Sequence, residues 1–293
     1  MITTPFLGTG VALVTPFKND YTIDFGALEL IVNHVIENGV NYLVALGTTS
    51  EAPVMSENEK AEVLKTFITV NDGRVPVVLG IGGNNTDSIV KQIEKTNFAN
   101  IAGILSVTPY YNKPAQNGLL AHYDLIAKAS PVPLILYNVP GRTGVNMKAA
   151  TTLELAHKHS NIIAVKEASG DVLQIMDIIA QKPAHFEVIS GDDALTLPLI
   201  ALGAKGVISV AANAFTKPFT AMVDAQLMND NELAKALHYK MLKLVELLFI
   251  EGNPAGVKAV MKEMNLCENV VRLPLTPASE QLRLQIAAQL AIF

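Results

Sequence analysis

The chain has 293 residues, of which half are hydrophobic and 17% are charged. A chain of this composition can bury a large core, which excludes an intrinsically disordered protein. The formal net charge of −5 gives no general attraction to phosphate backbones or anionic lipids, so we expect neither nucleic acid nor a membrane as a partner. Cys267 is the only cysteine and the first basic residue is Lys18, so we expect a cytosolic protein without a signal peptide.

Short apolar runs alternate with amphipathic stretches over the first three quarters of the chain. The runs are rich in Val and Ile and almost continuously hydrophobic, which is typical of parallel strands buried on both faces. They lie at 10–15, 42–47, 75–81, 103–107, 133–138, 162–168, 186–190 and 206–211. The first two predicted helices follow the N-caps Asp24 and Ser56, and the others lie at 87–98, 118–129, 147–158, 172–181, 194–202 and 219–228.

Eight strands and eight helices in strict alternation fit either an eightfold barrel or an open doubly wound sheet. Eight units within about 225 residues favour an α/β fold of the (β/α)8 TIM-barrel type. The alternation stops near residue 230, and three helices are predicted at 231–250, 254–264 and 277–292. We therefore divide the chain into a barrel (1–229) and a C-terminal helical region (230–293), packed on the barrel or on a neighbouring subunit.

Lys166 is the most informative residue, because it lies inside the apolar run at 162–168. Strand alternation places Ala164, Lys166 and Ala168 on one face, which leaves room around the lysine. Burial disfavours the charged ammonium, so that a free amine becomes available to add to a ketone and form a Schiff base. The alternative is a structural lysine paired with a carboxylate.

Other polar residues follow strand ends, where the active site of a barrel forms. Tyr137 can relay protons or be a buried core aromatic. Arg142, between two glycines, can bind a carboxylate or be an exposed surface residue. Thr48 and Thr49 can hold a small carboxylate or belong to an ordinary turn. The spacing of the His, Asp and Glu residues predicts no metal site. The sequence contains no nucleotide-binding motif, so we expect no cofactor.

Together, these segments resemble the dihydrodipicolinate synthase (4-hydroxy-tetrahydrodipicolinate synthase) family of class I, pyruvate-dependent aldolases. Their order and spacing agree with that family over nearly the whole chain. The segments are Gly-Thr-Thr-Ser-Glu (47–51), Thr-Pro-Tyr-Tyr-Asn (108–112), Tyr-Asn-Val-Pro-Gly-Arg-Thr-Gly (137–144), Val-Lys-Glu (165–167), Ser-Gly-Asp-Asp (190–193), Gly-Val-Ile-Ser (206–209) and Arg-Leu-Pro-Leu-Thr-Pro (272–277).

The resemblance implies a catalytic role for four residues. Lys166 would form the Schiff base with pyruvate, and Tyr137 would shuttle protons. Thr48 and Tyr111 would complete the proton relay, with Tyr111 reaching into the site of a neighbouring subunit of a homotetramer built as a dimer of dimers.

The resemblance also implies the substrates and the residues that bind them. Thr49 would hold the pyruvate carboxylate, and Gly191 and Ile208 would line the pocket. Arg142 would bind the carboxylate of L-aspartate 4-semialdehyde. The product would be 4-hydroxy-tetrahydrodipicolinate, on the diaminopimelate and lysine biosynthetic route. The alternatives are a sibling Schiff-base lyase for sialic acid or 2-keto-3-deoxy sugars, which usually lacks the arginine, and a non-catalytic binding protein.

The sequence departs from the family pattern in two places. Ser50 replaces a glycine that many members have, so we expect a local change of backbone conformation with the site retained. Members inhibited by lysine line an interface pocket with two histidines and a glutamate, and the matching residues here are Glu57, Lys60 and Ser88, although Asn84 and Tyr110 are retained. We therefore expect weak or absent inhibition by L-lysine.

Overall fold

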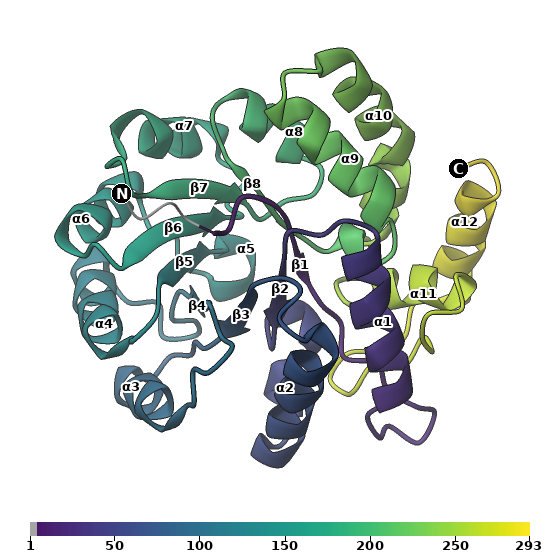
Figure 1. Cartoon of the computed structure of the whole chain (residues 1–293), viewed down its shortest axis with the longest axis horizontal. Coiled ribbons are helices and arrows are strands. Elements are labelled where there is room, and N and C mark those ends of the chain that lie inside the picture. The colour runs from purple at the N-terminus through teal and green to yellow at the C-terminus, as the bar shows by residue number, and fades with distance from the viewer. Residues whose placement is uncertain (1–4) are drawn as a thin grey trace.

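The computed structural model describes residues 5–293, within which eight parallel strands close into a barrel in chain order (Figure 1). Each strand pairs with its neighbours in sequence, and β1 pairs with β8 to complete the ring. The strands are β1 (Gly8–Ala12), β2 (Tyr42–Ala45), β3 (Val77–Gly80), β4 (Gly103–Val107), β5 (Leu134–Asn138), β6 (Ile162–Glu167), β7 (Glu187–Ser190) and β8 (Gly206–Ser209). The predicted TIM barrel is confirmed.

Helices surround the barrel and connect successive strands. Both predicted N-caps are present: Asp24 accepts the N–H of Ala27, and Ser56 forms a reciprocal capping box with Glu59. Within residues 5–293, no helix is long and apolar enough to cross a membrane. The surrounding helices are α1 (Phe25–Glu37), α2 (Glu57–Asn71), α3 (Thr86–Lys95), α4 (Gln116–Ala129), α6 (Ala149–Lys158), α7 (Val172–Gln181), α8 (Thr196–Ala201) and α9 (Thr216–Leu227).

Apolar side chains fill both the inside of the ring and the space between strands and helices. Successive residues of a strand point alternately into the ring and toward the helices. Val44 therefore packs inside the ring, and Leu43 packs against the helices. Strand β6 departs from this rule, because Ile163 and Ala164 both join the inner cluster where the register with β5 shifts. Alternation resumes after Ala164 and brings Lys166 beside the aromatic ring of an inner residue, Tyr137.

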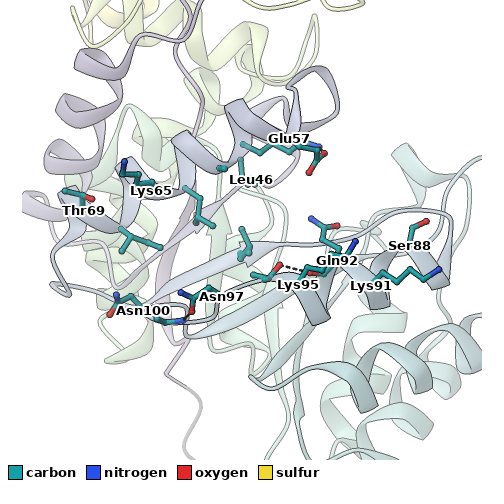
Figure 2. A pocket seen from close by; sticks show the side chains of 17 residues that line it. Leu46, Glu57, Lys65, Thr69, Ser88, Lys91, Gln92, Lys95, Asn97 and Asn100 are labelled. Atoms are coloured by element: carbon teal, nitrogen blue, oxygen red, sulfur yellow. Dashed lines mark hydrogen bonds and ion pairs between the residues drawn. The ribbon is translucent and has the colours of Figure 1, made fainter.

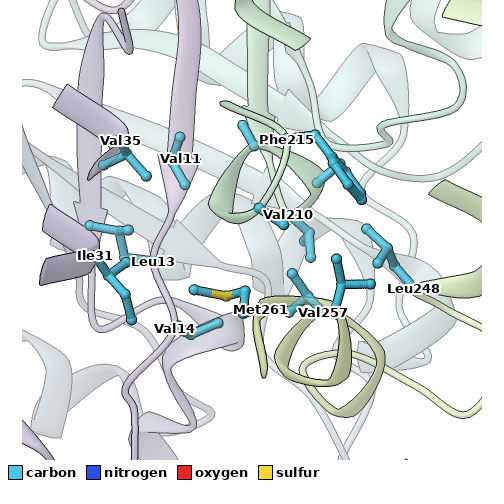
Figure 3. Packing of buried hydrophobic residues seen from close by; sticks show 14 of the residues in the cluster. Val11, Leu13, Val14, Ile31, Val35, Val210, Phe215, Leu248, Val257 and Met261 are labelled. Atoms are coloured by element: carbon cyan, nitrogen blue, oxygen red, sulfur yellow. The ribbon is translucent and has the colours of Figure 1, made fainter. Parts of the chain in front are cut away.

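The C-terminal helices α10 (Asn231–Leu247), α11 (Ala255–Glu263) and α12 (Glu280–Leu290) pack on the barrel beside α1 and α9 (Figures 1 and 3). Figure 3 shows Met261 and Val257 of α11 in the same cluster as Leu13 and Val14, which follow β1. Of the two expected positions, these helices therefore occupy the one on the barrel. The boundary at 229/230 stays a prediction.

The first strand differs from the prediction, because it begins at Gly8 and ends at Ala12. Leu13 and Val14 are fully buried outside the sheet because α11 packs near them, so their hydrophobicity mimics a longer strand. Short helical turns were not predicted, because a few residues carry no readable periodicity. They are α5 (Pro140–Thr143), η1 (Thr48–Ser50), η2 (Ala52–Val54) and η3 (Ala211–Asn213).

The ring closes where β1 and β8 approach each other through two glycines, Gly8 and Gly206. A Cβ atom on Gly206 would lie 2.0 Å from the carbonyl oxygen of Gly8, and Gly206 has a φ of +153°. The contact is with backbone, which has no flexible end that could move aside. Glycine at 206 is therefore a condition for closing the barrel.

Replacing Gly206 with Ala should lower the free energy of unfolding by about 3 kcal/mol, because backbone in the barrel wall must shift. Urea unfolding followed by circular dichroism measures the change. Gly26→Ala is the matched control: its Cβ would meet the Asp24 carboxylate at an ordinary 3.5 Å. An alanine there favours the helix, so this variant should be as stable as wild type or slightly more stable. Equal midpoints for both variants would contradict the closure argument.

Candidate active site

A cavity of about 320 Å³ opens at the carboxyl ends of the strands. Most of the site residues predicted from sequence line this cavity, although they come from separate segments of the chain. They are Thr48 and Thr49 after β2, Tyr137 on β5, Arg142 on α5, Lys166 on β6 and Gly191 after β7. Ile208 is buried in the inner apolar cluster with Tyr137.

Lys166 lies opposite Tyr137 in the β5–β6 register, and its Nζ is 4.4 Å from the centre of the tyrosine ring. The lysine is only 4% exposed. Within residues 5–293 it forms no ion pair, so the alternative of a carboxylate-paired structural lysine does not describe this chain. The site therefore presents an amine, with a phenol beside it, to whatever enters the cavity.

Gly191 gives the lysine its space. Its N–H donates to the carbonyl of Glu167, which holds the end of β7 against β6. A Cβ at this position would lie 2.7 Å from the Cβ of Ala168 and 3.0 Å from the Cε of Lys166. Only glycine lets the backbone approach the lysine stem this closely.

The segment after β2 forms the 3-10 turn η1 and holds two hydroxyl groups at the cavity. Thr49 is buried, and its Oγ1 accepts a hydrogen bond of 2.9 Å from Asn253 Nδ2. Ser50 donates its hydroxyl to the carbonyl of Gly47 at 2.7 Å, inside the turn. The left-handed conformation falls on the next residue, Glu51 (φ +58°), so a serine fits at position 50 without the freedom of a glycine.

Arg142 lies on the short helix α5 at the mouth of the cavity. It is exposed, and its Nη2 is 3.5 Å from the carbonyl oxygen of Asn253. Gly144, at a φ of +70°, ends α5 two residues after the arginine. Among residues 5–293 the guanidinium has no other hydrogen-bond partner, so most of its donors can bind a carboxylate.

Tyr111 does not line the cavity of its own chain. It lies on the connection between β4 and α4, is 88% exposed and has a φ of +75°. The neighbouring Tyr110 is also exposed, and Asn84 Nδ2 donates to its carbonyl oxygen at 3.4 Å.

A buried carboxylate, Glu167, ties together the strands that carry Lys166 and Tyr137. Its Oε1 accepts from Asn138 Nδ2 at 2.6 Å, and its Oε2 accepts from Gln174 and Ser169 at 3.1 Å each. Burial raises the pKa of Glu167 to about 7, although these hydrogen bonds favour its charged form. The network fixes the ends of β5 and β6 from outside the ring.

Asn253 was not predicted as a site residue. It lies between α10 and α11, is buried, and contacts both Thr49 and Arg142. No strand precedes it, so the strand-end rule that found the other residues could not find it. Among residues 5–293, no group of three or more His, Cys, Asp or Glu side chains could hold a metal ion.

Comparison with known proteins places the chain in a family. The profile of the dihydrodipicolinate synthetase family matches residues 5–292. The chain belongs to the dihydrodipicolinate synthetase family. The resemblance inferred from the motifs is therefore confirmed over nearly the full length.

Individual relatives of this family are similar over more than nine tenths of their length. The 4-hydroxy-tetrahydrodipicolinate synthase of Parabacteroides distasonis is 52% identical over 270 residues, which are 92% of this chain and 91% of the relative. The enzyme of the same name from Flavobacterium psychrophilum is 50% identical over 277 residues, 94% of each chain. The crystal structure of dihydrodipicolinate synthase from Thermotoga maritima matches with a TM-score of 0.96 and 38% identity, over 99% of each chain.

The raised pKa of Glu167 should make the free energy of unfolding depend on pH. Between the ordinary carboxyl pKa of 4.5 and about 7, the folded chain binds a proton at Glu167 that the unfolded chain has released. The free energy of unfolding should therefore fall by about 3 kcal/mol through this group as the pH rises across that window. Glu167→Gln removes the titration, so the stability difference between wild type and variant, measured by urea unfolding at pH 5 and pH 8, should change by this amount. Parallel pH dependences would contradict it.

Proposed function

We propose that this member of the family condenses pyruvate with L-aspartate 4-semialdehyde to 4-hydroxy-tetrahydrodipicolinate, as a lyase of the diaminopimelate and lysine pathway. The names of the relatives at about half identity support the reaction. The observation that carries the proposal is the buried Lys166 amine, which lies beside Tyr137 in a cavity and has no carboxylate partner in residues 5–293.

The lysine amine adds to the ketone of pyruvate and releases water, which forms a protonated imine. This cation withdraws electrons, so the methyl group of pyruvate loses a proton and becomes an enamine nucleophile. Its carbon attacks the aldehyde of the second substrate, whose own amine then displaces Lys166 from the imine carbon and closes the ring. The sum is one product and one water from two substrates, with the lysine regenerated.

These steps move several protons, so they need a relay and not a single base. We assign the first proton transfers to Tyr137, because the centre of its ring lies 4.4 Å from Lys166 Nζ. In our proposal Thr48 continues the relay and Tyr111 completes it from a neighbouring subunit. The 88% exposure of Tyr111 in the single chain is consistent with such a contact.

The two substrates each bring a carboxylate. We assign the pyruvate carboxylate to Thr49, with Gly191 and Ile208 lining the pocket, and the carboxylate of the semialdehyde to Arg142 at the mouth. A bidentate arginine suits a short aldehyde that carries a carboxylate. A sugar-cleaving relative would need groups for a polyol chain there. We further propose a cytoplasmic enzyme that assembles as a homotetramer.

Borohydride reduction in the presence of pyruvate tests the proposal. The trapped imine should add the mass of a reduced pyruvate adduct to the peptide that contains Lys166, and Lys166→Met should abolish the label. Arg142→Leu separates the two half-reactions: it should trap pyruvate as wild type does but lose at least about a hundredfold in kcat/KM for the semialdehyde, because a charge-assisted contact is removed. An adduct on another lysine, or no adduct, would sink the proposed mechanism.

The residues that match the lysine-binding pocket of inhibited family members lie on a different part of the surface. Glu57, Lys60 and Ser88 line a cleft of about 870 Å³ between α2 and α3, and Figure 2 shows Glu57 and Ser88 on its two sides. Lys60 Nζ forms an ion pair of 2.8 Å with Glu57. An ammonium in this position repels the ammonium groups of a lysine ligand, and Ser88 supplies no carboxylate to hold them.

We therefore predict weak or absent feedback inhibition. The activity of the purified enzyme should change little in millimolar L-lysine, with sodium chloride at equal ionic strength as the control. Strong inhibition at sub-millimolar L-lysine would overturn this prediction.

A further inference from the structure

A fully buried ion pair joins the C-terminal helices to the loop after β2. Lys258 on α11 is 0% exposed, and its Nζ lies 2.6 Å from Oε1 of Glu51, which is 1% exposed. The second carboxylate oxygen, Oε2, accepts the backbone N–H of Arg272 at 2.8 Å. Lys258 also donates to the carbonyl of Val270 at 2.9 Å and lies 4.3 Å from the centre of the Phe17 ring. Both charges are therefore completely surrounded by partners.

Such a pair is not explained by stability alone. Removing two charges from water costs about as much as their attraction returns, and an apolar pair of similar volume often serves folding equally well. An ion pair restricts the relative position of the two segments that carry it, because the charged groups must meet in one hydrogen-bonding geometry. The role of the pair therefore depends on which part of the chain it holds in place.

The pair holds the segment that carries Thr48 and Thr49. Glu51 immediately follows the turn η1 (Thr48–Ser50) and adopts the left-handed conformation, which is unfavourable for a residue with a Cβ. Its N–H donates to the carbonyl of Thr48 at 3.3 Å, so the position of Glu51 sets the end of the turn. Asn253, in the turn before α11, donates a hydrogen bond to Thr49 Oγ1. Helix α11 and the residue before Pro254 thus fix this loop at two points.

We infer that the Glu51–Lys258 ion pair is a positioning device for pyruvate, which holds the Thr48–Thr49 turn in the conformation that receives the substrate carboxylate. The inference rests on the function proposed above. Neither charged residue lines the cavity, so both act through the loop and not on the substrate. Their loss should weaken pyruvate binding much more than it slows the reaction at saturating pyruvate.

The decisive variant is Glu51→Gln/Lys258→Met, which replaces the ion pair with two neutral side chains of similar size. It leaves no unpaired buried charge, so it should fold and unfold near the wild-type temperature, whereas Lys258→Met alone should be clearly less stable. The pyruvate concentration for half-maximal borohydride trapping at Lys166 should rise at least tenfold in the double variant. KM for pyruvate should rise in parallel, and kcat should fall by less than threefold.

The matched control is Lys262→Met/Glu268→Gln, which removes an exposed ion pair that begins on the same helix. It should trap pyruvate as wild type does. A double variant that folds and traps pyruvate at wild-type concentrations would mean that the Glu51–Lys258 pair is only structural.

A second variant keeps the inference testable if the double variant does not fold. Glu51→Asp keeps the charge but withdraws the carboxylate by one methylene, and it should also raise the half-maximal concentration several-fold. An unchanged value in a folded Glu51→Asp protein would likewise overturn the inference. If wild type itself shows no adduct at Lys166, the proposed function fails first, so the two failures are distinguishable.

Discussion

Closing eight parallel strands into one ring forces all their carboxyl ends onto the same rim, and the rest of the molecule depends on this constraint. Thr48, Tyr137, Lys166 and Gly191 lie near or just after the carboxyl ends of four different strands, yet they line one cavity of about 320 Å³. The ring closes where β1 and β8 meet at Gly8 and Gly206, and the backbone of Gly8 lies too close to Gly206 for a Cβ there. A local steric condition therefore assembles a site from distant parts of the chain.

The packing of the barrel interior also determines the surroundings of the polar side chains at this rim. Most of its filling is aliphatic, and the inner cluster ends near the amine of Lys166 and the phenol of Tyr137. Small neighbours, Ala168 and Gly191, leave the lysine stem room without offering it a carboxylate. Glu167, on the opposite face of β6, places its carboxyl group outside the ring and fixes the strand ends from there through hydrogen bonds. Strand alternation thus places the Lys166 side chain and the Glu167 carboxyl group on opposite faces of β6.

The C-terminal helices contribute more than a cover for the barrel. They share one apolar cluster with α1 and with the residues that follow β1. From this packed position, α11 reaches the loop after β2 through Lys258, while Asn253 reaches it from the turn before the helix. The geometry of the cavity is therefore set from both sides, by the strands below and by the helical region beside them.

The sequence by itself determined the fold and most of the residues that line the cavity, because both depend on local patterns. Hydrophobic periodicity separates strands from helices, the caps at Asp24 and Ser56 mark helix starts within one turn, and a lysine in an apolar run is conspicuous. Only the tertiary structure decided which distant groups meet. Asn253 at Thr49 and Lys258 at Glu51 are contacts across 204 and 207 residues of sequence. No periodicity or spacing encodes such contacts, since they arise only when the C-terminal helices pack on the closed barrel.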